Sequence, residues 1–145
     1  MPSSRLLLST TAAESILSHA RDGASHDGGP REVCGVLVGD RGDGTAPDAA
    51  TDIRRVPNAA SEPRARYELD PEATLAAIEA AEAAGDDVIG FYHSHPESRA
   101  RPSETDRREA TWEGYVYLIV SPAYDELRAW RWTGERFDPL DVDIG

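Results

Sequence analysis

The sequence predicts an α/β fold in which helices flank one mixed central β-sheet. Apolar stretches of strand length alternate with helical patterns along the chain, an arrangement typical of such folds. The length of 145 residues suffices for a buried core and is short for a second domain of ordinary size. We therefore expect residues 1–145 to form a single domain.

Three segments carry the signals of helices. A Thr-Ala-Ala-Glu capping pattern, followed by apolar residues at helical spacing, predicts a first helix over about residues 11–21. An Asp-Pro pair, with aspartate at the cap and proline in the first turn, predicts a second helix over residues 70–85. A third helix should run over about residues 103–112.

Six apolar or alternating stretches predict strands. The stretch at 33–38 is apolar throughout and suits a strand buried on both faces, whereas 127–132 alternates. The glycine-rich stretch 39–52 is expected to be a connection, and 67–69 a short extended piece. Beyond the last strand the chain should turn toward Phe137. The predicted strands are 6–8, 33–38, 53–56, 88–93, 115–120 and 127–132.

The charge of the chain argues against one class of partner. The formal net charge is −12, and nucleic-acid-binding proteins normally carry a basic face, so we expect no nucleic-acid partner. All 15 cationic side chains are arginines, a composition similar to that of proteins from salt-loving, GC-rich organisms. No apolar stretch has the build of a membrane span or a secretory signal, so we expect a soluble, cytoplasmic protein.

The most informative motif is His-Ser-His-Pro at residues 93–96, followed after six residues by Ser-Glu-Thr-Asp at 103–106. Because side chains alternate along an extended chain, His93 and His95 point to the same side and can approach one ion. The loop after them reverses the chain, which can bring Asp106 to the same point as a third ligand. Two histidines and one carboxylate leave one coordination position open, the arrangement of a catalytic zinc.

These residues resemble the signature of the JAMM/MPN+ metalloprotease family: an upstream glutamate, His-x-His-Pro, six residues and Ser-x-x-Asp. The similarity covers most of the chain, from Glu32 to the strand expected at 115–121. The resemblance implies a cytidine-deaminase-like JAMM/MPN architecture, with Glu32 as the general acid/base and Ser103 as a donor to the tetrahedral oxyanion. It implies zinc ligands at His93, His95 and Asp106.

The resemblance also implies a substrate class. The chain looks like archaeal JAMM isopeptidases, so we expect it to release a small ubiquitin-like modifier from lysine after a Gly-Gly tail, with Zn²⁺ as cofactor. The tail would bind by strand addition at a sheet edge near the metal. A lysine-free enzyme would also offer no ε-amine of its own for conjugation. Two alternatives stay open: a peptidase that trims a sulfur-carrier protein, and a catalytically inactive MPN scaffold. The oligomeric state is left open.

Ordinary structural roles compete with several of these assignments. The pattern Ser103–Asp106 is also a common helix capping box, and a glutamate at the start of a strand, such as Glu32, is usually solvated. Cys34 is the only cysteine, which excludes an internal disulfide and a thiolate-rich zinc site, and a buried free cysteine is more often a small apolar residue. We expect structural roles for His19, His26 and Ser94, and positions in or beside the core for Trp112, Trp130 and Trp132.

Overall fold

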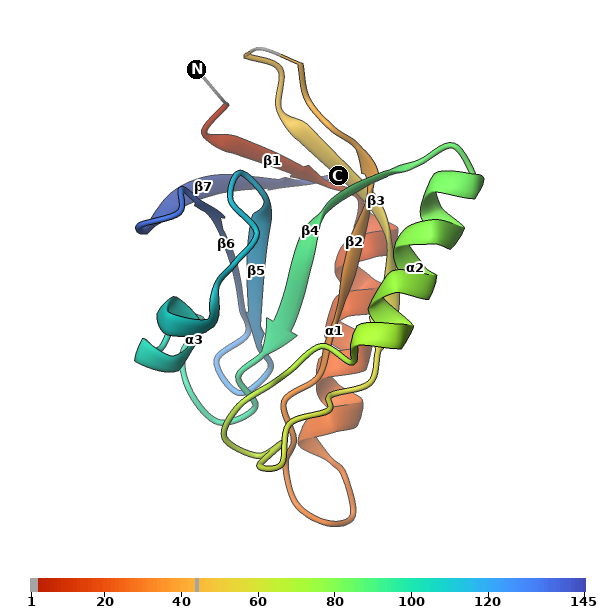
Figure 1. Cartoon of the computed structure of the whole chain (residues 1–145). Helices are drawn as coiled ribbons and strands as arrows, with labels where there is room; N and C mark the ends of the chain where they lie inside the picture. The colour runs from red at the N-terminus through yellow and green to blue at the C-terminus, as the bar shows by residue number, and fades with distance from the viewer. Residues whose placement is uncertain (1–2, 44) are drawn as a thin grey trace.

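Regular elements follow one another along the residues that the computed structural model describes, 3–43 and 45–145. Figure 1 shows two long helices packed on a strongly curved sheet and a short third helix beside it. The elements are β1 (Arg5–Leu8), α1 (Thr10–Ala24), β2 (Cys34–Asp40), β3 (Asp48–Val56), α2 (Pro71–Ala83), β4 (Asp87–Ser94), α3 (Glu104–Glu109), β5 (Val116–Ser121), β6 (Glu126–Trp132) and β7 (Phe137–Ile144).

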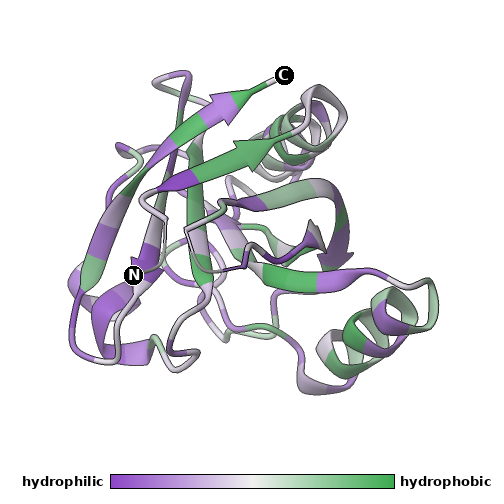
Figure 2. Cartoon of the chain, turned by 90° about the horizontal axis from the view of Figure 1, so that it is seen from above, coloured by the Kyte–Doolittle hydropathy of each residue, from purple (hydrophilic) through white to green (hydrophobic). Residues whose placement is uncertain are grey.

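The sheet is mixed and closes on itself in the order β1-β3-β2-β4-β5-β6-β7. β1 closes it by pairing in parallel with both β3 and β7, and β4 pairs in parallel with β5. The remaining pairs are antiparallel. Figure 2 shows from above how the strands curve round. Each described strand thus has two neighbours, but β1 pairs with only the first three residues of β3, so residues 51–56 have no strand partner on that side. The strand addition expected for a substrate tail stays a prediction.

Two apolar cores lie on the two faces of the sheet. One packs α1 against Leu37 and Tyr92, and the other packs α2 against Val36 and Phe91. Because neighbouring residues of a strand face opposite ways, β4 contributes to both cores. His93 follows Phe91 by two residues and so lies on the α2 side of the sheet. This alternation directs the first histidine of the motif away from α1.

The predicted α/β class, the mixed sheet and all three helices are confirmed, with differences at several boundaries. The aspartate cap begins α2 as expected: the side chain of Asp70 accepts the N–H of Ala73. β3 begins at Asp48, five residues before the expected start at residue 53, and pairs with β2 across a register shift between Val38 and Gly39. A Cβ at Gly39 would lie 1.9 Å from the Ala49 carbonyl oxygen, so glycine permits this close pairing.

The structure refines three further expectations. The segment after the expected turn forms β7, which pairs with β6 across that short turn and with β1, far away in sequence. α3 ends at Glu109 instead of near residue 112, and the piece at 67–69 contributes a single bridge, from Leu69 to Asn58.

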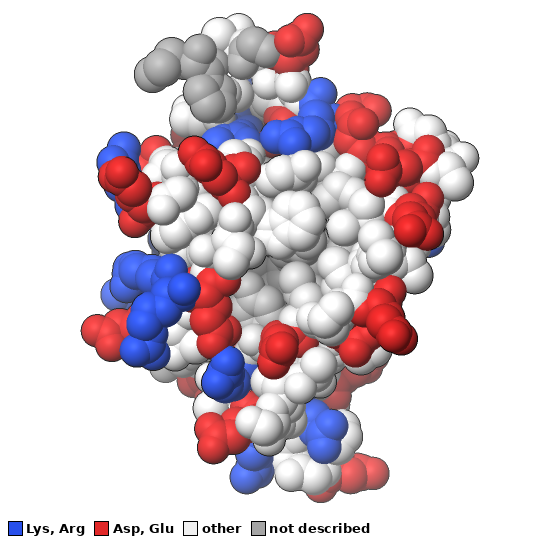
Figure 3. All heavy atoms as spheres, viewed as in Figure 1, with Lys and Arg blue, Asp and Glu red and all other residues white. Residues whose placement is uncertain are grey.

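Trp132 lies in the core, and Trp112, which is 40% exposed, lies beside it. Trp112 lies against Phe91 at the rim of the second core, with a ring-centroid distance of 5.1 Å. Figure 3 shows an uncharged area over this part of the molecule, between α2 and α3, with acidic and arginine side chains around it. None of the described helices combines the length and apolar character needed to cross a bilayer.

Candidate active site

Three of the predicted site residues meet at one point. His93 lies near the end of β4, His95 just beyond it, and Asp106 in the first turn of α3. The Nε2 atoms of the two histidines are 3.3 Å apart, and Asp106 Oδ2 is 3.2 Å from each of them. The three side chains are 2%, 7% and 8% exposed. The loop between the motif halves therefore brings the predicted groups together as the spacing suggested.

The dimensions of this triangle suit a tetrahedral metal ion. Zinc–nitrogen bonds of about 2.0–2.1 Å place two tetrahedral ligands about 3.3–3.4 Å apart. The distances among His93, His95 and Asp106 are 3.2 to 3.3 Å, which matches that spacing. The two Nε2 atoms and the Asp106 oxygen all carry lone pairs, which repel one another at this distance. A proton or a cation between them would remove that repulsion.

Neighbouring groups fix both imidazole rings. His95 Nδ1 lies 2.9 Å from the Arg99 carbonyl oxygen, to which it donates, so Nε2 is left free to bind a metal. The ring of Tyr67 stacks on that of His93, with centroids 4.0 Å apart. Burial lowers the pKa of His93 and favours its neutral form. Burial opposes protonation of His95 too, but its bonds with Asp106 and the Arg99 carbonyl raise the pKa of His95.

Asp106 serves the helix and the site at once. Its N–H donates to Ser103 Oγ at 3.0 Å, and its Oδ2 accepts the N–H of Ser103 at 2.9 Å, which completes a capping box. Burial by itself would raise the pKa of Asp106, but the two imidazoles and the Ser103 N–H hold it well below its usual range. Ser103 Oγ acts as an acceptor in the box, so its hydroxyl hydrogen remains available to a further acceptor. The pattern Ser103–Asp106 can therefore form a helix capping box and contribute to the candidate site at the same time.

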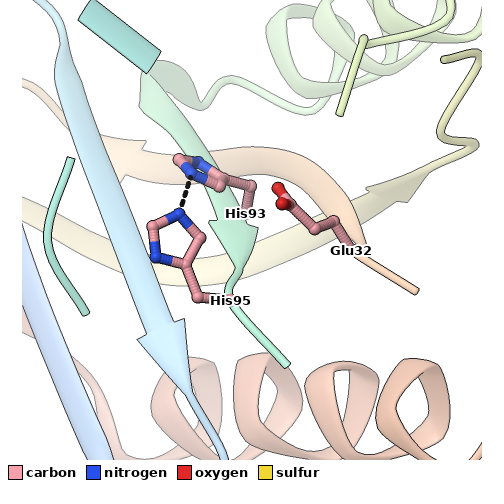
Figure 4. Close-up of side chains that lie close together, drawn as sticks. All are labelled: Glu32, His93 and His95. Atoms are coloured by element: carbon pink, nitrogen blue, oxygen red, sulfur yellow. Dashed lines mark hydrogen bonds between the residues drawn. The ribbon is translucent and has the colours of Figure 1, made fainter. Parts of the chain in front are cut away.

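Glu32 reaches the same place from the residues just before β2. One of its carboxylate oxygens and one ring nitrogen each of His93 and His95 lie within 4.8 Å of one another, and Figure 4 shows the carboxylate directed toward the imidazoles. The residue is 7% exposed, and its Oε1 has no hydrogen-bond partner among the described residues. Burial raises the pKa of Glu32 to about 8. Glu32 is therefore not the solvated carboxylate usual at a strand start.

A residue that we did not predict anchors Glu32. The side-chain amide of Asn58 donates to the Glu32 carbonyl oxygen at 2.9 Å and to that of Arg66 at 3.1 Å. Its Oδ1 accepts the N–H groups of Ala60 and Glu68, both at 3.0 Å. One amide thus ties the segment after β3 to the backbone of Glu32. No local sequence pattern predicts this role of Asn58, because its partners lie up to 36 positions apart, from Glu32 to Glu68.

Residues expected to be structural do have structural contacts. Ser94 faces away from the site and accepts the N–H of Val33 at 2.9 Å. His19 Nδ1 lies 2.7 Å from the buried hydroxyl of Tyr92, and burial lowers the pKa of His19 to about 4. His26 Nδ1 accepts the N–H of Gly28 within a loop. The Cys34 thiol is buried and its pKa is raised to about 12, so it is an apolar group at neutral pH.

A groove of about 200 Å³ adjoins the triangle on the α2 side of the sheet. Tyr67, which stacks on His93, forms one wall, and Phe91, Trp112 and Tyr117 add further aromatic surface. Glu68 and Glu109 also line the groove. An apolar segment of a partner could lie there within reach of the histidines.

The fold and this constellation define the class of the protein. The family described as prokaryotic homologs of the JAB domain matches residues 11–133, and the chain belongs to it. The chain is 55% identical to a desampylase of Haloferax volcanii over 144 residues, 99% of each chain. It is 34% identical to the CysO-cysteine peptidase of Mycobacterium tuberculosis over 131 residues, 87% of this chain and 82% of that protein.

A solved structure supports the same assignment. A Desulfitobacterium hafniense protein, determined in solution, superposes with a TM-score of 0.83 at 28% identity and covers 97% of this chain and 92% of its own. The resemblance to the JAMM/MPN+ family and the expected JAMM/MPN fold are therefore confirmed. The chain is a hydrolytic enzyme of the JAMM type.

Proposed function

We propose that this protein is a zinc-dependent isopeptidase that releases a small ubiquitin-like modifier from lysine side chains by cutting after its Gly-Gly tail. The observation that carries the proposal is the triangle of His93, His95 and Asp106, whose 3.2 to 3.3 Å sides suit zinc. Zinc bound there would supply a Lewis acid that activates water and polarises a carbonyl group.

The side chains around the triangle suit the remaining steps of peptide hydrolysis. Glu32 is positioned to take a proton from the attacking water and pass it to the departing amine. A raised pKa suits this exchange, because the group must both accept and release a proton near neutral pH. The hydroxyl of Ser103 can donate to the oxygen that gains negative charge on the attacked carbonyl.

The relatives support a modifier as substrate. The Haloferax protein is named a desampylase and shares 55% of its residues over nearly its whole length with this chain. The groove beside His93 offers aromatic side chains, together with Glu68 and Glu109, to the residues that precede a Gly-Gly tail. Residues 51–56 of β3 have a strand partner only in β2, so their other edge remains open to the strand addition expected for the tail.

The composition supports function at high salt concentration. The net charge of −12, without any lysine, matches proteins of salt-loving archaea, and the desampylase named above comes from Haloferax volcanii. At molar salt the Debye length falls to about 3 Å, so self-repulsion among surface carboxylates is screened. We infer a cytoplasmic archaeal enzyme whose residues 1–145 act as one domain.

The test is incubation with two kinds of substrate, read by intact mass. A ubiquitin-like modifier linked to lysine should be released in full-length form by the zinc-loaded protein and remain conjugated when a chelator is present. Cleavage of only a C-terminal cysteine from a sulfur-carrier protein would favour the alternative that the CysO-cysteine peptidase suggests. A protein that binds modifier but cleaves neither substrate would be a scaffold.

A further inference from the structure

The loop at 97–102 connects His95 to the helix that carries Asp106. The backbone N–H of His95 still donates to the Val120 carbonyl oxygen, at 2.9 Å, but this bond does not fix the rotation of the ring. That rotation depends on Nδ1, which donates to the carbonyl oxygen of Arg99 at 2.9 Å. The direction in which His95 presents Nε2 is therefore set by where the loop holds the Arg99 carbonyl.

One carboxylate holds that part of the loop. Glu126, the first residue of β6, accepts from Arg99 Nε on one oxygen and from Arg99 Nη2 on the other, both at 2.7 Å. The N–H of Ala100 donates to Glu126 at 3.2 Å, and Arg128 adds a contact at 3.3 Å. The Glu126 side chain is only 14% exposed, although Arg99 is 48% exposed. Such a two-pronged pair fixes direction as well as distance.

A second side chain holds the same loop one residue earlier. Ser121, the last residue of β5, is fully buried and donates its hydroxyl to the Ser98 carbonyl oxygen at 2.6 Å. Ala100 is fully buried too, so its N–H would have no access to water if Glu126 were removed. Hydrogen bonds from β5 and β6 thus hold the loop at the residues before and after Arg99.

We propose that Glu126 is a positioning residue for the metal centre, which through Arg99 and Ala100 holds the loop carbonyl that orients His95. This inference rests on the proposed zinc site and adds a residue that the His-x-His and Ser-x-x-Asp motif does not contain. Groups that orient a metal-ligating histidine typically change metal affinity about 10- to 100-fold when removed. Glu126 acts on the metal from β6, outside the elements that carry the ligands.

The test measures zinc affinity by competition with a chromogenic chelator, without substrate. Glu126→Ala should raise the zinc dissociation constant about 10- to 100-fold. Glu126→Gln keeps one acceptor oxygen, which can still receive Arg99 Nε and the Ala100 N–H but not Arg99 Nη2 as well, and should fall between that variant and the unchanged protein. Asp143→Ala removes a carboxylate that pairs with Arg5 on β1, and it should bind zinc normally. It controls for the loss of an arginine–carboxylate pair as such.

Two further measurements separate positioning from stability. With saturating zinc, Glu126→Ala should lower kcat and leave KM unchanged, and Arg99→Ala combined with Glu126→Ala should weaken zinc binding no more than the stronger single variant does. If the Glu126 variants lose thermal stability but keep normal zinc affinity, the positioning role is refuted. An unchanged protein that binds no zinc would instead refute the proposed function, so the two failures are distinguishable.

Discussion

Replacing Glu32 by glutamine should change how the stability of the zinc-free protein depends on pH. Burial raises the pKa of the Glu32 carboxyl from 4.5 to about 8. A carboxyl with a raised pKa in the folded state contributes stability that is fully present below pH 4.5 and is lost as the pH rises through about 8. Glutamine stays uncharged at every pH, so the variant does not lose this stability as the pH rises.

The structure sets the size of the effect. The interval between 4.5 and about 8, at about 1.4 kcal/mol for each pKa unit, gives a ceiling of about 5 kcal/mol. Partial hydration of the ionised carboxylate reduces this, so we expect on the order of 3 kcal/mol. The zinc-free Glu32→Gln variant should therefore be more stable than the unchanged protein at pH 9, and the two should be similar at pH 5.

The assay is urea unfolding of chelator-treated proteins from pH 5 to pH 9. The remaining ionisable groups of the site occur in both proteins, so the difference between the two free energies of unfolding reports Glu32 together with its effect on the pKa values of His95 and Cys34. Glu79→Gln, an exposed position on α2, is the matched control and should follow the unchanged protein. Parallel curves for the unchanged protein and Glu32→Gln would mean that the carboxylate is hydrated, and the argument from burial would fail.

Three other changes probe the ligands, the hydroxyl and the packing. His95→Ala should abolish stoichiometric zinc binding in metal analysis, because it removes one corner of the triangle; retention of about one zinc per chain would refute the ligand role. Ser103→Ala should lower kcat about 100- to 1,000-fold while zinc stays bound; undiminished turnover would contradict an oxyanion role. Gly35→Ala should lower the free energy of unfolding by about 1–3 kcal/mol, because a Cβ there would lie 2.4 Å from the Tyr92 ring and 2.5 Å from the Arg54 carbonyl oxygen. An unchanged urea midpoint would show that these neighbours move aside at no cost in stability, which would refute the prediction.

Elements with strong local signals were predicted well, and those defined by distant partners were not. The aspartate cap and the proline after it locate the start of α2 because both act within one turn of the backbone. β7 is harder, because its sequence Phe-Asp-Pro-Leu-Asp-Val-Asp-Ile mixes charge and proline with apolar residues. It is a strand because β6 and β1 pair with it, and no local pattern reports that pairing.

The residues of the candidate site also differ in how well the sequence predicts them. His93, His95 and Asp106 could be found from spacing, because a strand end, a loop and a capped helix place them by local geometry. Glu32 came only from the family resemblance, since nothing near it in sequence distinguishes it from other carboxylates. Glu126 was missed because its role depends on the packing of β6 beside a loop 27 residues away.

The position of β1 between β3 and β7 makes the two ends of the chain depend on each other. Sheet closure requires residues near position 5 to meet residues near position 143, so during synthesis it cannot occur before position 143 has left the ribosome. Contacts of such long sequence separation also slow folding. Before closure, β3 and β7 each present an open row of backbone groups to other chains. Newly made protein is therefore most vulnerable to self-association just before its last strand docks.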